Sequence, residues 1–210
     1  MALTILADAL KKCNVNNDKC KHITLNGERI WSSEFFVYNK GIVGEDEGAV
    51  TLTLHHQGWN SNEVKQSKDS KIEEDHIHLI GAGSGGGRSG GDNVDSASWV
   101  VFDNVDVSDA ETLYMTFDLS AVSSAAPAIL AVSDTEPSSG AGMPQRFITY
   151  HTLVANQMTT GKTYGKVTNQ TISCNVKNLT GKKKIIAMTW ANSYDSGYYS
   201  DLYIYSIKLE

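Results

Sequence analysis

The sequence predicts an all-β fold, a jelly-roll β-sandwich that follows a short N-terminal helix. After residue 20, short apolar segments recur with clusters of Gly, Asn, Asp and Ser between them, which is the spacing of strands and turns. Polar and apolar side chains alternate in residues 49–55, AVTLTLH, as in a strand with one buried face. No long helical period follows residue 20. At 210 residues and 40% hydrophobic content, the chain can bury a core without disulfide bonds.

A helix is expected only at the start of the chain, over residues 2–13. Its apolar side chains fall at helical spacing: Leu3, Ile5, Leu6 and Leu10. Turn-forming residues follow it and end the helical pattern. We therefore expect residues 1–31 to be an N-terminal attachment or oligomerisation segment, and residues 32–210 to be the sandwich.

The β pattern begins with a predicted hairpin over residues 22–31, turning at Asn26-Gly27. Asn-Gly is a strong hairpin signal because both residues tolerate a positive φ. Strands are expected at residues 22–25, 28–31, 35–38, 49–55, 77–80, 98–102, 112–119, 128–132, 146–154, 170–176, 183–190 and 201–209.

A glycine-rich segment, residues 81–91, interrupts the expected strands. It lacks the Gly-Lys-Ser/Thr end of a phosphate-binding loop, and no βαβ unit surrounds it. We expect a flexible insertion in the sandwich instead.

Charge and cysteine content narrow the class of protein. The net charge of -6 argues against binding to nucleic acid or to an anionic membrane surface. No stretch is apolar enough for a transmembrane helix, and Asp8 interrupts the N-terminal apolar run, so no signal peptide is expected. Cys13, Cys20 and Cys174 show no regular disulfide spacing and are expected to be free, buried thiols, as in a protein that folds in the cytoplasm; the alternative is a Cys13–Cys20 disulfide.

The sequence shows no catalytic motif, and we expect no enzyme, no cofactor and no bound metal. His76 and His78 share one face of a strand, but no third ligand has a defined spacing to them. His55 and His56 are likewise expected to be ordinary strand histidines. No nucleophile-elbow pattern stands at a strand–helix turn. Paired carboxylates for glycoside hydrolysis stay open, because their separation is set in space.

An aromatic stretch near the C-terminus, residues 190–201, is the candidate carbohydrate-binding site. The chosen residues are Trp190, Asn192, Tyr194, Asp195 and Tyr198. Aromatic faces stack on the C–H faces of sugars, and amide or carboxylate groups bond to hydroxyls. The same mixture suits a protein-binding surface, and some of the rings are alternatively expected to close the end of the sandwich.

The order of segments from residue 34 onward resembles the galactose-binding-like jelly roll of family-six-type carbohydrate-binding modules. The segments that carry the resemblance are residues 34–38, 41–45, 97–107, 112–117 and 202–209. The resemblance implies sugar-stacking aromatics on loops at one end, where Trp190 or Tyr194 would correspond. The family's structural calcium uses an N-terminal acidic residue, matched by Glu34, and a last-strand aspartate, which is Tyr205 here. We therefore expect no calcium.

A weaker resemblance concerns the start of the chain, which is similar to small structural proteins of tailed bacteriophages. It implies a non-enzymatic virion protein for decoration, a fibre or the tail, assembled in the host cytoplasm and involved in host attachment. Residues 1–31 would bind a virion or surface-assembly protein, and the chain would form a homo-oligomer. The alternative function is a carbohydrate-binding module that recognises a cell-surface or plant polysaccharide.

Overall fold

The computed structural model contains two compact units, residues 1–35 together with Glu210, and residues 36–209. The boundary expected from the sequence lies after residue 31. The residues that the structure describes are 14–15, 18–19, 22–25, 28–32, 35–44, 50–58, 69–82, 94–108, 110–122, 128–137, 155–162, 165–192 and 199–210.

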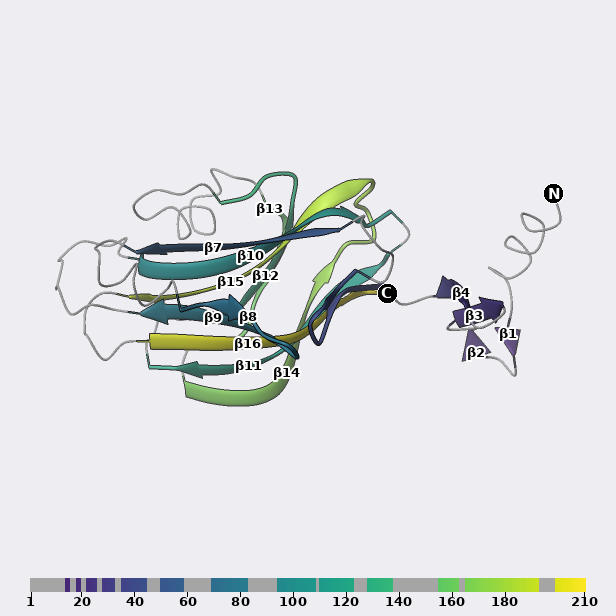
Figure 1. Ribbon diagram of the computed structural model, residues 1–210. Coiled ribbons are helices and arrows are strands. Elements are labelled where there is room, and N and C mark those ends of the chain that lie inside the picture. Colours follow the sequence, from purple (N-terminus) through teal and green to yellow (C-terminus); the bar gives the residue numbers. More distant parts are fainter. Residues whose placement is uncertain are drawn as a thin grey trace. The chain divides into compact units, whose positions relative to one another are not determined.

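The N-terminal unit contains short antiparallel strand pairs (Figure 1). Strand β1 (Asn14–Val15) pairs with β2 (Asp18–Lys19), and β3 (His22–Leu25) pairs with β4 (Glu28–Ser32). The β3–β4 pair confirms the hairpin predicted around Asn26-Gly27. The helix expected over residues 2–13 lies outside the described residues.

The larger unit is a sandwich of two antiparallel sheets, as the sequence predicts. In the described part of the chain, one sheet is five-stranded, in the order β13-β12-β15-β10-β7. Its strands are β7 (Thr51–Gly58), β10 (Val94–Asp106), β12 (Ile129–Ser133), β13 (Ala155–Thr160) and β15 (Lys182–Asn192). The strand expected at residues 146–154 lies outside the described residues.

The other sheet is seven-stranded, with the order β14-β11-β16-β5-β6, and β9 pairs with both β16 and β8. Its strands are β5 (Phe35–Asn39), β6 (Ile42–Val43), β8 (Lys71–Ile72), β9 (Ile77–Ala82), β11 (Thr112–Ala121), β14 (Gly165–Asn175) and β16 (Tyr199–Leu209). Figure 1 shows the two sheets as stacked layers of the larger unit.

The chain crosses between the sheets at most steps along the larger unit, which gives the jelly-roll connectivity. It passes from β9 to β10, β11 and β12 in alternate sheets, and again from β14 to β15 and β16. As a result, β10 lies beside β15 in one sheet and β11 lies beside β16 in the other. The predicted all-β jelly-roll sandwich is therefore confirmed.

The two sheets differ in how they are buried. Strand β11 alternates between buried and half-buried side chains, as expected for a sheet with one face in the core. In the five-stranded sheet every residue of β12 is buried, and so are residues 97–102 of β10 and 185–191 of β15. Both faces of the five-stranded sheet are therefore covered.

The two sheets lie close together at Gly81, near the end of β9. A Cβ on Gly81 would lie 2.5 Å from the backbone carbonyl carbon of Trp190 on β15. This contact corrects one expectation. Gly81 and Ala82 belong to strand β9, while residues 83–91 of the expected flexible insertion lie outside the described residues. A glycine is required at this position because the two backbones touch.

Small hydroxyl side chains fill the rest of this close approach. Ser70 Oγ donates to Ser98 Oγ at 2.8 Å, and Ser98 Oγ donates to the carbonyl of Ile80 at 2.6 Å. Thr189 and Ser200 form a second buried hydrogen bond, between β15 and β16. Gly81 and these hydroxyl groups form what we call the seam: Ser70, Gly81, Ser98, Thr189 and Ser200.

Adding one methyl group at Gly81 tests whether the two sheets are in backbone contact at the seam. Replacing Gly81 with Ala is expected to lower the free energy of unfolding by about 3 kcal/mol, the upper end for overpacking, because the new Cβ meets rigid backbone. Urea denaturation measures the change. Thr168→Ala, on exposed residue 168 of β14, is the control and is expected to change stability by less than ~0.5 kcal/mol. Equal stability of the two variants would contradict the close approach.

Cys174 on β14 is buried in the interface between the sheets, and its Sγ donates to the carbonyl of Leu130 at 3.4 Å. Burial raises the pKa of the Cys174 thiol from 9.0 to about 12. The folded chain therefore holds this proton at pH values where the unfolded chain loses it. The resulting contribution to stability is complete below pH 9 and is lost as the pH rises toward 12.

The buried thiol is expected to resist alkylation, because the thiolate is the reactive form. In a Cys13→Ser/Cys20→Ser variant, iodoacetamide at about pH 8.5 should modify Cys174 quickly in urea and very slowly in native buffer. Mass spectrometry of timed samples measures both rates. Rapid labelling of the native protein would show that Cys174 is accessible, against the structure.

Candidate binding face of the five-stranded sheet

The outer face of the five-stranded sheet is the side that points away from the seven-stranded sheet. Strand alternation separates the two faces. Phe102, Leu130 and Thr189 point inward, because they contact Tyr38, Cys174 and Ser200 of the other sheet. The residues between them point outward and form a buried apolar cluster of Ala97, Trp99, Val101, Ile129, Ala131, Ile186, Met188 and Trp190. Half-buried Met158 packs against it.

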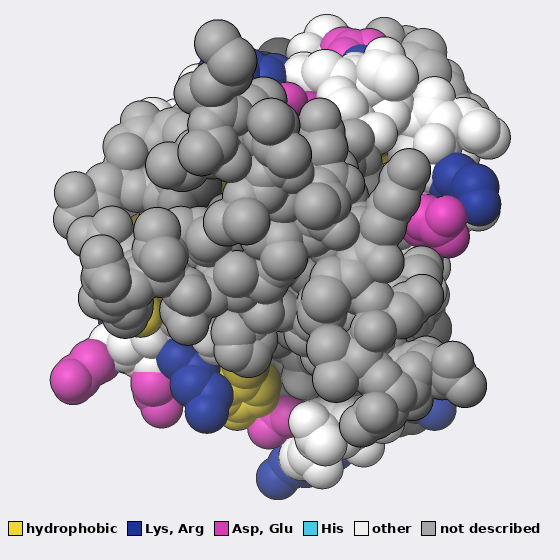
Figure 2. All heavy atoms as spheres, turned by 90° about the vertical axis from the view of Figure 1, so that its right-hand side faces the viewer, with side chains coloured by type: hydrophobic (Ala, Val, Ile, Leu, Met, Phe, Trp, Pro, Cys, Tyr) yellow, Lys and Arg dark blue, Asp and Glu magenta, His cyan; other side chains and the backbone are white. Residues whose placement is uncertain are grey.

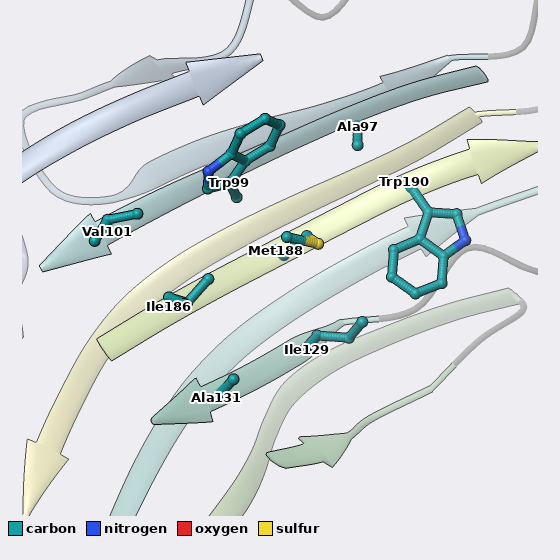
Figure 3. Packing of buried hydrophobic residues seen from close by; sticks show 8 residues of the cluster. All are labelled: Ala97, Trp99, Val101, Ile129, Ala131, Ile186, Met188 and Trp190. Carbon is teal, nitrogen blue, oxygen red and sulfur yellow. The ribbon is translucent and has the colours of Figure 1, made fainter. Parts of the chain in front are cut away.

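Strand register sets the order of this outer face. Trp99 on β10 lies opposite Met188 on β15, and Ala97 lies opposite Trp190. The two indoles therefore stand on neighbouring strands, offset by two residues, and Figure 3 shows Met188 between them. Trp99 is 1% exposed and Trp190 is 8% exposed. Trp190 is therefore the member of the cluster that lies nearest the C-terminal end of β15.

His55 on β7 continues the row beyond Trp99. The two residues are register partners, and their rings stack with centroids 5.3 Å apart and planes 9° apart. His55 Nε2 and Trp99 Nε1 are both buried, and neither has a hydrogen-bond partner in the described part of the chain. Most buried polar atoms in proteins are hydrogen-bonded, so two unsatisfied nitrogens on one stacked pair are unusual.

An ion pair marks the opposite end of the outer face. Lys184 Nζ lies 2.5 Å from Asp103 Oδ2, one alternation step beyond Ile186 and Val101. The hydrogen bond from the Lys184 ammonium lowers the pKa of the Asp103 carboxyl. Because each charge neutralises the other, this end offers no net charge to a ligand.

The five residues that the sequence predicts to bind carbohydrate lie in different parts of the chain's structure or outside its described residues. Trp190 lies in the buried cluster, at its least buried position, and Asn192 ends β15 with its backbone paired to Val94. Tyr194, Asp195 and Tyr198 lie outside the described residues.

The aromatic stretch is also divided between the two sheets. Tyr199 begins β16 in the seven-stranded sheet and is 38% exposed, while its neighbour Ser200 points into the seam. The Trp190 and Tyr199 rings therefore face opposite sides of the sandwich. They do not converge on one site.

His76 and His78, which the sequence suggested as possible metal ligands, lie on the outer face of the seven-stranded sheet. His78 Nε2 is 2.9 Å from Asp201 Oδ1, and the His78 ring stacks on Tyr203 with centroids 4.3 Å apart. His76 Nδ1 lies 2.6 Å from Asp75 Oδ1. Among the described residues, no group of three or more His, Cys, Asp or Glu side chains is placed to hold a metal ion.

Tyr205 occupies the last-strand position at which the resemblance to carbohydrate-binding modules implies an aspartate. Its hydroxyl donates a hydrogen bond to Asp118 Oδ2 at 3.1 Å. That hydrogen bond and burial raise the pKa of Tyr205, with burial the larger cause. Tyr205 thus joins β16 to β11 by its hydroxyl, in the position where a carboxylate was expected.

On the face drawn in Figure 2, acidic and basic side chains are interspersed. No helix in the described part of the chain is long and apolar enough to cross a membrane.

The burial of Met188 provides a test that the outer face is packed. Met188→Ala is expected to lower the free energy of unfolding by about 2–5 kcal/mol, because it removes a fully buried side chain from between two indoles. Urea denaturation of this variant and of Thr168→Ala measures the difference. A cost below ~0.5 kcal/mol, typical of surface positions, would show that this face is open to solvent.

No protein-family model matches the sequence, and no curated protein matches it. Among solved structures, the chain is similar to a family 61 carbohydrate-binding module in complex with β-1,4-galactotriose, with 14% identity and a TM-score of 0.33 over 79% of this chain and 83% of that one. The N-terminal cellulose-binding domain of Cellulomonas fimi β-1,4-glucanase C matches with 9% identity and a TM-score of 0.35, over 77% of this chain and 93% of its own.

The enzymatically active domain of bacteriophage CBA120 tailspike protein 4 matches with 11% identity and a TM-score of 0.34, over 76% of this chain and 19% of its own. Carbohydrate-binding modules are thus among the structures to which the chain is similar. Because all of these TM-scores lie below 0.5, the ligand has to be argued from the residues of this chain.

Proposed function

We propose that this chain is a non-enzymatic glycan-binding module whose site lies at the Trp190 end of the five-stranded sheet. The observation that carries the proposal is the position of Trp190, the least buried member of an aromatic and apolar sheet face. An indole presents the largest flat aromatic surface among the side chains. Such a surface suits the C–H face of a sugar ring.

The backbone around Trp190 favours a preorganised site. Gly81 touches the Trp190 backbone from the inner side, and Thr189 is hydrogen-bonded to Ser200 in the seam. The main chain that carries the indole is therefore held on its inner side. Affinity benefits when little motion is lost on binding.

The residues that follow Trp190 supply the polar half of the proposed site. Asn192 and Asp195 carry amide and carboxylate groups that bond to sugar hydroxyls, and Tyr194 and Tyr198 add aromatic surface. Asn192 is the last residue of β15, and the other three come after it in the chain, on the side of the strand end that bears the indole. We propose Trp190 as the stacking residue and these four as its polar and aromatic complement.

Substitution of the stacking residue tests the proposal. Trp190→Leu keeps an apolar side chain in the buried cluster but removes the flat ring, and Tyr194→Ala removes an aromatic ring outside that cluster. Each variant is expected to weaken binding at least tenfold to the glycans that the unmodified chain retains on an array of bacterial and plant polysaccharides. Leu is preferred to Ala at position 190 because truncating a buried Trp costs about 3–5 kcal/mol and risks unfolding.

Tyr114→Ala is the matched control, since Tyr114 is a half-buried aromatic residue on the outer face of the seven-stranded sheet. This variant is expected to bind glycans like the unmodified chain. Circular dichroism and urea denaturation establish that each variant is folded. An array with no bound glycan, or full binding by both site variants, would refute the proposal.

The virion role expected from the sequence stays a prediction. The compact N-terminal unit of residues 1–35 is the feature that favours an attachment function for this region. A glycan-binding sandwich joined to such a unit would suit a host-attachment protein. Attachment through residues 1–31 to a virion or surface assembly, and homo-oligomer formation, are part of that prediction.

A further inference from the structure

Four rings form an aromatic patch on the outer face of the seven-stranded sheet, where β9 and β16 are adjacent (Figure 1). His78 lies opposite Tyr203 in the strand register, and the two rings stack with centroids 4.3 Å apart. The His76 ring is tilted against both tyrosines, with centroids 5.5 Å from Tyr203 and 6.1 Å from Tyr205. All four residues are partly exposed, so a partner reaches the patch from solvent.

Three carboxylates border the aromatic patch, and each is hydrogen-bonded to one of its residues: Asp75, Asp118 and Asp201. The side chains of Asp75 and Asp201 are 72% and 29% exposed. Each of these two carboxylates contacts its histidine through Oδ1, and neither Oδ2 has a partner in the described part of the chain. The border therefore offers carboxylate oxygens to a donor from outside.

The carboxylates also set the electrostatic potential at the two tyrosines. Burial raises the pKa of Tyr203, and the charge of Asp201 raises it further. Burial likewise raises the pKa of Tyr205, and the hydrogen bond and charge of Asp118 and the charge of Asp75 add to this effect. A negative charge that opposes ionisation of a phenol attracts a positive charge to the same place.

Another tyrosine on the same sheet face already has a cation beside it. Lys208 Nζ lies over the Tyr114 ring, 5.5 Å from its centroid, and the two residues are register partners. The tyrosines of the aromatic patch have no such lysine or arginine over their rings in the described part of the chain. Lys71, on the nearby strand β8, is paired with Glu73 at 2.5 Å. The patch therefore combines rings and carboxylates without a cation from its own described residues.

We propose that the aromatic patch and its three aspartates form a docking site for an arginine side chain of a protein partner. A guanidinium is planar, stacks on aromatic faces and forms paired hydrogen bonds with carboxylates, so it uses both parts of the site. A lysine ammonium is attracted by the same charges but has no flat surface to stack. The site lies on the opposite sheet from Trp190, so this inference does not depend on the glycan-binding function.

The charge of the border disfavours other classes of partner. An anionic ligand would be repelled by three carboxylates that lie around one patch. An apolar protein surface would bury those carboxylates without new hydrogen bonds, which costs free energy. The net charge of -6 on the whole chain adds a long-range attraction for a basic partner.

Peptides that differ only in one side chain test the choice of arginine. The probes are a short glycine peptide with two arginines, the same peptide with lysines, and the same peptide with citrulline, a neutral isostere of arginine. Each is titrated into the full chain and followed by NMR. The arginine peptide is expected to shift the ring resonances of Tyr203 and Tyr205, which are assigned by their loss in the Phe variants. It should bind about threefold more tightly than the lysine peptide, and the citrulline peptide should not bind.

Variants of the chain locate the site. Asp201→Asn is expected to weaken binding of the arginine peptide about tenfold, as for the loss of a charged hydrogen bond. Tyr203→Leu removes the stacking ring and should weaken it about threefold to fivefold. Glu136→Gln is the matched control, because it removes the same charge from an exposed residue that follows β12 in the other sheet, and it should change affinity less than about twofold. Urea denaturation establishes that each variant is folded.

Three results would overturn the docking site. The first is equal weakening in Asp201→Asn and Glu136→Gln, which would reflect only the net charge of the chain. The second is equal binding of the arginine and citrulline peptides, and the third is no binding of the arginine peptide. Glycan binding by Asp201→Asn is expected to match that of the unmodified chain, so failure of this site and failure of the glycan-binding function are measured separately.

Discussion

The close approach of the two sheets at Gly81 is the constraint on which the rest of the sandwich depends. Because no side chain stands at this position, the backbone of β9 touches the backbone of β15 at Trp190. The hydroxyl groups of the seam then reach across the gap and hydrogen-bond to each other and to the backbone. A polar seam in a core is stable only when every member has a partner, and the small size of its side chains allows this.

The same constraint explains why the outer face of the five-stranded sheet carries the large side chains. Where the sheets touch, the inward positions of β10 and β15 hold only small residues, Ser98 and Thr189. The indoles of Trp99 and Trp190 therefore have room only on the outer side. Apolar packing is divided between the interior of the sandwich and this outer face, so a candidate binding surface also contributes to the stability of the fold.

Strand positions were predictable because alternation and turn chemistry are local signals. The hairpin at Asn26-Gly27 and the strand over residues 49–55 follow from neighbouring residues alone. The end of β9 was not predictable in this way. Gly81 begins a glycine-rich run, and its pairing with Ser200 of β16 makes it a strand residue. The His55–Trp99 pair has no sequence signal either, since it depends on the register of β7 on β10.

The candidate site shows how far an aromatic-rich segment can mislead. Trp190 and Tyr199 are close in sequence, but β15 and β16 belong to different sheets, so their rings face opposite sides. Trp190 instead shares the outer face of its own sheet with Met188 and Trp99, and His55 stacks on the far side of Trp99. A face built from buried rings holds few hydrogen-bonding groups, and each unpartnered nitrogen on it weakens the fold.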